Sequence, residues 1–180
     1  MGTASKYKAQ HQTFSGAAQF IAASCITANV VIGNTTDETV LISETISADV
    51  FDNTITHFKV TIAGDISSDG TDDVAFQLRY GTTDILALTT VGLANEDDKQ
   101  FRLEIYGRIH TTGATGKIVA SGRLNMEQGT PLLVVNNTAV AGVTADLTVD
   151  GSINVTAQWD GAAATSTLTA IVGTIQFFNQ

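Results

Sequence analysis

The chain has 180 residues, of which 43% are hydrophobic and only 15% are charged, and its formal net charge is −9. This length is sufficient for one domain with a real core, and the charged share lies below the ~25% usual in soluble domains, which suits a surface that other chains partly cover. The negative charge argues against sequence-independent nucleic-acid binding and against an anionic membrane surface, because both need clustered basic residues and the nine lysines and arginines are scattered along the sequence.

The first 35 residues differ from the rest because apolar and polar residues do not alternate in them. Residues 17–23 are compatible with a short helix, and we predict an N-terminal arm over 1–35 that precedes a sandwich domain over 36–180. The apolar stretch 20–32 is too short and too polar to span a bilayer. Cys25 is the single cysteine, and we expect it to be a small buried apolar residue rather than a nucleophile, because no neighbouring base marks it.

Alternation of apolar and polar residues begins near residue 38 and predicts strands with one face toward a core. In the run 57–62, for example, Phe58, Val60 and Ile62 share one face. Glycine and aspartate separate such runs at intervals of roughly 10–15 residues, a rhythm typical of a β-sandwich or barrel. A change of phase near Gly173 predicts a bulge in the last run. We expect an all-β, antiparallel sandwich with strands over 38–47, 56–63, 73–80, 84–90, 99–110, 116–126, 131–136, 143–149, 152–159 and 166–178.

One acidic loop is a candidate metal site. The run Asp65-Ile-Ser-Ser-Asp-Gly70 resembles the opening of an EF-hand loop, in which Asp65 and Asp69 would be calcium ligands. The twelfth position of such a loop would be Phe76, which cannot supply the bidentate carboxylate. Two alternatives stay open: a weak calcium site at Asp65 and Asp69, or a hairpin connection in which the aspartates cap turn amides.

Motifs for catalysis are absent from the sequence. The three histidines lie far apart and fit surface or strand-end positions, and no nucleophile elbow, zincin or Walker A motif occurs. The inward-facing residues are almost all apolar, which argues against a cupin-like enzyme because that needs histidine and carboxylate ligands converging on the interior. We therefore predict no catalytic residue and no cofactor. Trp159, the only tryptophan, continues an inward series and is expected in the core, although an exposed position would allow sugar stacking.

The order of the strand patterns resembles a known architecture. The blocks are TVLISETISA (39–48), FKVTIAGDI (58–66), VAFQLRYG (74–81), FRLEI (101–105) and INVTAQW (153–159). Together they resemble a jelly-roll type common among virion structural proteins of tailed bacteriophages, including head decoration proteins, fibres and tail components. The resemblance spans about residues 38–178 and carries over no site residues. It implies a jelly-roll sandwich, often trimeric, that is built into a virus particle.

These observations give a leading functional hypothesis and one alternative. The first is a non-enzymatic capsid decoration or cement protein, located in the virion, which forms a homotrimer and packs against the major capsid protein or another virion protein. It would bind neither nucleic acid nor a membrane. The alternative is a carbohydrate- or receptor-binding jelly-roll module of a tail tip or fibre, which a cluster of exposed aromatic residues would favour.

Overall fold

The computed structural model describes residues 19–33, 35–48, 51, 57–90, 93–127 and 133–179. These residues form eleven strands and contain no α-helix, and accordingly no helix of membrane-spanning length and hydropathy occurs among them. The strands are β1 (Gln19–Cys25), β2 (Val30–Gly33), β3 (Thr39–Ile46), β4 (His57–Asp69), β5 (Val74–Tyr80), β6 (Thr83–Thr89), β7 (Asn95–Thr111), β8 (Gly116–Met126), β9 (Leu133–Ala145), β10 (Gly151–Trp159) and β11 (Thr167–Asn179).

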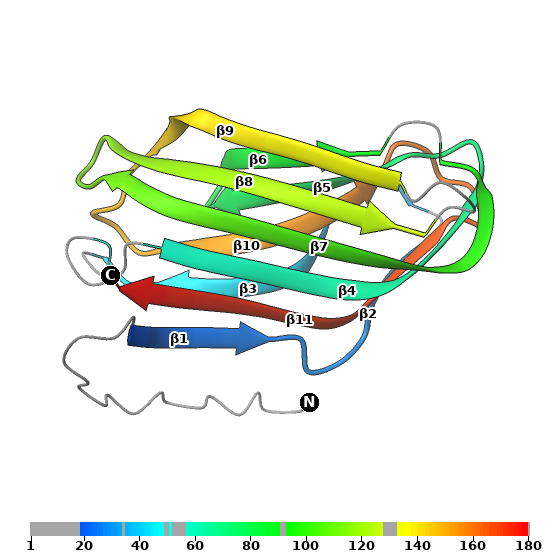
Figure 1. Ribbon diagram of the computed structural model, residues 1–180, viewed down its shortest axis with the longest axis horizontal. Coiled ribbons are helices and arrows are strands. Elements are labelled where there is room, and N and C mark those ends of the chain that lie inside the picture. The colour runs from blue at the N-terminus through cyan, green and yellow to red at the C-terminus, as the bar shows by residue number, and fades with distance from the viewer. Residues whose placement is uncertain are drawn as a thin grey trace.

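The strands form two antiparallel sheets that pack face to face (Figure 1). Sheet A has the order β1-β11-β4-β7-β8-β9, with β2 also paired to β11, and sheet B has the order β3-β10-β5-β6. The chain crosses between the sheets repeatedly, so that β3 lies beside β10 in sheet B while β4 lies beside β11 in sheet A. This wrapping of early strands against late ones in both sheets is a jelly-roll topology, which the hairpin β8–β9 extends on one side. The predicted all-β, antiparallel sandwich is confirmed.

Inward-facing side chains of both sheets meet in one apolar core. In β4 buried and partly exposed residues alternate along the whole strand, as one face of a sheet requires. Phe76 of sheet B and Phe101 of sheet A are in ring contact across the core, with centroids 5.4 Å apart. Each fully buried large apolar side chain stabilises the fold by about 1.5–3 kcal/mol. The largest fully buried side chains are Trp159, Phe58, Phe76, Phe177, Ile32, Ile62, Leu78, Leu88, Leu103, Ile105 and Ile118.

Most of the predicted strands are confirmed, but several boundaries are wrong, including the start of β7, which lies at Asn95 rather than at residue 99. The strand expected over 56–63 continues to Asp69, and the chain turns only at Gly70, whose φ of +84° suits glycine. The ranges 131–136 and 143–149 are not separate strands, because β9 runs from Leu133 to Ala145. The ladder with β8 continues across a bulge in which Gly142 has a φ of +72°. The expected bulge in the last strand lies between Ala170 and Val172.

Strands also occupy part of the segment predicted as an arm. β1 and β2 pair with successive parts of β11 and thereby form one edge of sheet A, so the short helix considered over 17–23 is wrong from Gln19 onward. Backbone hydrogen bonding to the edge strand β11 does not require apolar and polar side chains to alternate, so the sequence pattern predicts no strand in this segment. Residues 1–18 lie outside the described residues, and the arm stays a prediction for them.

Candidate binding surface

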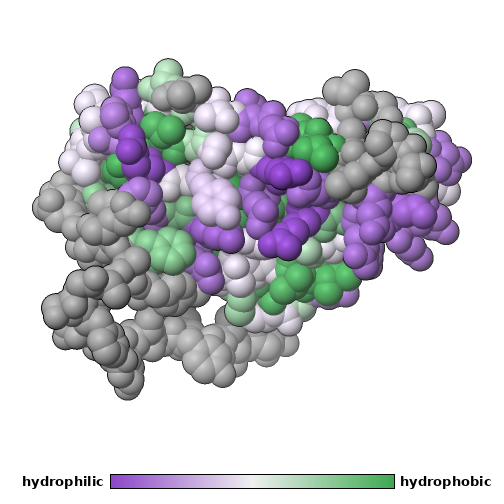
Figure 2. All heavy atoms as spheres, viewed as in Figure 1, coloured by the Kyte–Doolittle hydropathy of each residue, from purple (hydrophilic) through white to green (hydrophobic). Residues whose placement is uncertain are grey.

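The outer face of sheet A presents a broad, largely polar surface (Figures 1 and 2). It is formed by every second residue of β4, β7 and β8, whose neighbours in sequence are buried in the core. Strand register places side chains in rows that run across the sheet. Figure 2 shows this face, with strongly hydrophilic residues across its middle and apolar residues over β11. One such row contains Gln176, Lys59, Tyr106, Ser121 and Thr138.

Tyr106 is the exposed aromatic residue of this surface. Its side chain is 52% exposed on β7, where the pleat turns it away from the buried Ile105 and Gly107. The Lys59 ammonium on the paired strand β4 lies over the ring, 5.1 Å from its centroid. A cation–π contact of this kind favours one position of the ring. The sheet therefore presents a half-exposed aromatic ring among hydroxyl, amide and basic side chains.

Basic residues gather on the same face. Lys59, Arg102, Arg108, Lys117 and Arg123 all point outward from β4, β7 and β8, and we name these five residues the basic stripe. They are five of the seven described lysines and arginines, since Arg79 and Lys99 are the others. Basic residues that are scattered along the sequence thus gather on one face in three dimensions. Strand pairing brings together positions that are up to 64 residues apart, from Lys59 to Arg123.

Two residues of the basic stripe form ion pairs with the same carboxylate. Glu104 lies 2.8 Å from Arg102 Nη2 and 3.9 Å from Lys59 Nζ. Arg123 Nε donates instead to Asn125 Oδ1 at 2.9 Å, and Arg108 Nη2 lies 3.2 Å from His110 Nδ1. Arg108, Lys117 and Arg123 form no ion pair with a described carboxylate. The outer face of sheet A from the row of Arg102 to the row of Lys117 therefore carries excess positive charge in an acidic chain.

Beside the polar surface lies a group of exposed apolar residues. Val31 on β2 is 63% exposed, and Ile171 and Val172 at the bulge of β11 are 43% and 58% exposed. Val31 is paired with Thr169, two residues from Ile171, so the three side chains lie near one another at this edge of sheet A. We name Val31, Ile171 and Val172 the apolar strip. Exposed apolar clusters of this kind are typical of contact sites with other proteins.

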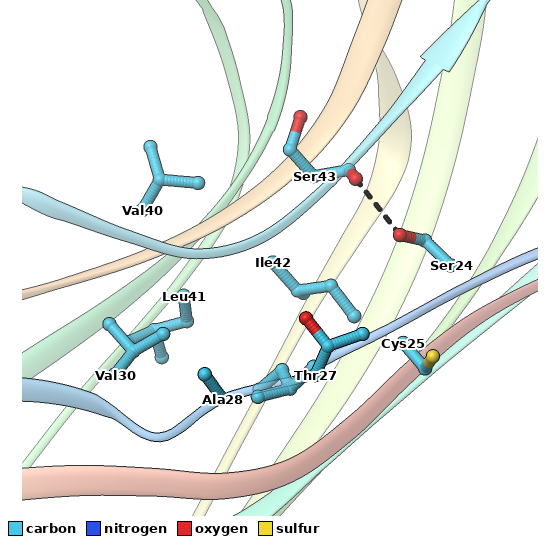
Figure 3. A pocket seen from close by; sticks show the side chains of 10 residues that line it. Ser24, Cys25, Thr27, Ala28, Val30, Val40, Leu41, Ile42 and Ser43 are labelled. Carbon is cyan, nitrogen blue, oxygen red and sulfur yellow. Dashed lines mark hydrogen bonds between the residues drawn. The ribbon is translucent and has the colours of Figure 1, made fainter. Parts of the chain in front are cut away.

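A shallow groove of about 260 Å³ opens between β3 and the connection from β1 to β2 (Figure 3). Val40, Leu41 and Ile42 line one side, and the opposite side includes Cys25. Ser24 Oγ donates a hydrogen bond to the Ser43 carbonyl at 3.1 Å across one end. Cys25 is exposed here, so its expected burial is wrong. The lining is apolar or hydroxylic and holds no acid–base pair.

The structure does not bring the two predicted calcium ligands together. Asp65 and Asp69 lie four residues apart in the extended strand β4, a separation of about 13 Å. The Asp69 carboxylate accepts hydrogen bonds from Thr71 N at 2.8 Å and Thr71 Oγ1 at 2.6 Å, which lower the pKa of Asp69. It thus caps the turn after β4. Among the described residues no group of three or more His, Cys, Asp and Glu side chains is suited to a metal ion.

The other singled-out residues occupy structural or peripheral positions. Trp159 is 1% exposed and lies in the core, as expected, so it cannot stack on a sugar. His57 and His110 lie near strand ends on the outer face of sheet A, whereas His11 lies outside the described residues. His57 is paired with Arg108, and His110 follows Arg108 by two residues on β7. Tyr80 is also buried. Among the aromatic side chains that the structure describes, Tyr106 is the large exposed one.

Comparisons with known proteins give little further information. No protein-family model matches the chain, and no curated protein matches it. Among solved structures, the chain is similar to the CBM2 module of the evolved Dit of Lactobacillus casei BL23 phage J-1. The identity is 14%, the match covers 77% of this chain and 69% of that chain, and the TM-score is 0.33. A similarity at this level does not identify a family.

Proposed function

We propose that this chain is a non-catalytic β-sandwich module that binds carbohydrate through the outer face of sheet A. The observation that carries the proposal is Tyr106, a 52% exposed ring on a polar sheet face. The C–H groups of a sugar ring pack on an aromatic face, while its hydroxyl groups hydrogen-bond to polar side chains around it. The row through Tyr106 supplies such groups in Gln176, Ser121 and Thr138.

The rest of the molecule supports a role in binding rather than in chemistry. Apolar side chains fill the space between the sheets, where a jelly-roll enzyme of the cupin type would hold its ligands. The resemblance of the strand patterns to virion proteins of tailed bacteriophages supports a location on a virus particle. On a particle, a carbohydrate-binding module would serve attachment to a glycan-coated surface.

Substitution of Tyr106 tests this function. We expect the purified chain to bind a subset of glycans on an array, and Tyr106→Ala to weaken that binding at least about tenfold, because both ring burial and stacking are lost. Tyr106→Phe keeps the ring and should retain most of the affinity. Failure of the unaltered chain to bind any glycan, or equal binding by Tyr106→Ala, would refute the proposal.

The apolar strip favours a second candidate function. A capsid decoration or cement protein stabilises a shell by packing against neighbouring subunits, and such contacts commonly bury about 1,600 Å² or more. Val31, Ile171 and Val172 lie at one edge of sheet A and supply an apolar centre for a contact of this kind. Either the major capsid protein or two further copies of this chain, in a homotrimer, would cover the strip.

A charge placed in the apolar strip tests this second function. Val172→Glu should abolish self-association or binding to virus particles, because it would bury an unpaired carboxylate in the contact. Val149→Glu is the matched control, since Val149 is 52% exposed and lies in the connection between β9 and β10. Native mass measurement and co-sedimentation with particles provide the readout. If neither the unaltered chain nor the variant forms oligomers or associates with particles, the decoration role is excluded.

A further inference from the structure

We propose that the carbohydrate bound by sheet A is acidic, a carboxylate-bearing polysaccharide that lies along β7 and β8 over the basic stripe. This inference rests on the proposed carbohydrate-binding function and names its ligand class. The stripe runs through the same surface as Tyr106, with Lys59 in contact with the ring itself. A sugar stacked on Tyr106 would therefore place its substituents within reach of cationic side chains.

The first argument is the distribution of charge. The chain carries nine basic and eighteen acidic residues, yet sheet A between the row of Arg102 and the row of Lys117 shows the opposite balance. There the outward face holds the five basic residues of the stripe and one carboxylate, Glu104. A local excess of one sign on a protein of the other sign attracts ligands of opposite charge.

The second argument is that three of these cations have no carboxylate partner among the described residues. On the outer face of sheet B, Arg79 is bound by two carboxylates, with Asp84 Oδ1 at 2.5 Å and Glu38 Oε2 at 2.6 Å. On sheet A, by contrast, Arg108, Lys117 and Arg123 form no ion pair with a described carboxylate. The fold thus neutralises its arginine on one face and leaves three basic side chains on the other face available to an external anion.

The third argument is the spacing of the stripe. Strand register places Arg102, Arg123, Lys59, Arg108 and Lys117 in successive rows, each about two residues further along the strands, with a bulge of β7 before the last row. Two residues of an extended strand span about 6.6 Å, so the stripe is about 26 Å long. Cations repeated at this interval over a band of three adjacent strands match an extended polymer with regularly repeated anionic groups better than they match a single small anion.

The surroundings of the stripe favour a polysaccharide over other polyanions. Hydroxyl and amide side chains alternate with the basic residues, and these groups can hydrogen-bond to the hydroxyl groups of a sugar. Carboxylate groups on sugar rings combine the two recognition elements that this face presents, an aromatic platform and cationic side chains. Nucleic acid is accordingly the competing ligand that the experiment must distinguish.

The experiment compares acidic and neutral polymers as probes. Polygalacturonate, alginate and hyaluronate are the carboxylate probes, dextran and galactan are the neutral probes, and a single-stranded DNA oligonucleotide is the third class. We expect at least one carboxylate polymer to bind about tenfold more tightly than the neutral polymers at low salt. Its affinity should fall as added salt shortens the Debye length. Arg108→Gln with Arg123→Gln should lower this affinity about tenfold.

A charge-matched control separates local contacts from net charge. Thr45→Glu with Ala87→Glu gives the same net charge as the double arginine variant, but both positions are exposed on sheet B. We expect the control to bind as the unaltered chain does. Neutral polymers bound as tightly as the carboxylate polymers would overturn this inference and leave the proposed function intact. Binding to no polysaccharide would overturn both, and tighter binding to the DNA probe would assign the face to nucleic acid instead.

Discussion

Gly107 leaves room for the Phe58 ring in the core beneath the candidate binding surface. A Cβ atom at this position would lie 1.9 Å from Phe58 Cζ, because the Phe58 ring crosses the glycine of the paired strand. Gly107→Ala should therefore overpack the core and lower the free energy of unfolding by about 1–3 kcal/mol. Chemical denaturation measures this loss. In the double variant with Phe58→Leu, the ring that clashes is gone, and the combined cost should be smaller than the sum of the two single costs. Additive costs would contradict the clash.

The sequence predicts some residues of the candidate binding surface and does not reveal others. Tyr106 lies between the inward residues Ile105 and Gly107, so the alternation that predicts the strand also predicts an outward tyrosine. Arg102 and Arg108 follow from the same phase. Their convergence with Lys59 and Arg123 depends on the register of β4 and β8 against β7, which no local pattern encodes. Asp65 and Asp69, the predicted calcium ligands, lie apart for a related reason, because β4 extends to Asp69 and separates residues that a loop would have placed close together.

At the level of elements, alternation predicted the strands that cover the core and missed those that depend on backbone pairing. β8 matches its expected bounds of 116–126, since its buried and exposed residues alternate throughout. β1 and β2 gave no signal, because their place is set by the free edge of β11. The sequence pattern predicts two strands in place of β9, because Asn136, Asn137 and Gly142 are typical of turns. There the bulge opposite Val119 accommodates the extra residues without ending the strand.

At the scale of the whole molecule, one core joins both sheets and predicts one cooperative unfolding transition. Residues of sheets A and B belong to the same apolar cluster, and Phe76 and Phe101 connect the sheets directly. Trp159, 1% exposed on β10, reports on sheet B through its fluorescence, while circular dichroism reports on the strands of both sheets. Because neither sheet can expose its inner face without exposing the other's, the two signals should change at the same denaturant concentration. Gly107→Ala, which alters sheet A alone, should shift both midpoints equally. Fluorescence and dichroism midpoints that separate, or a Gly107→Ala shift seen by only one of them, would show that the sheets unfold independently.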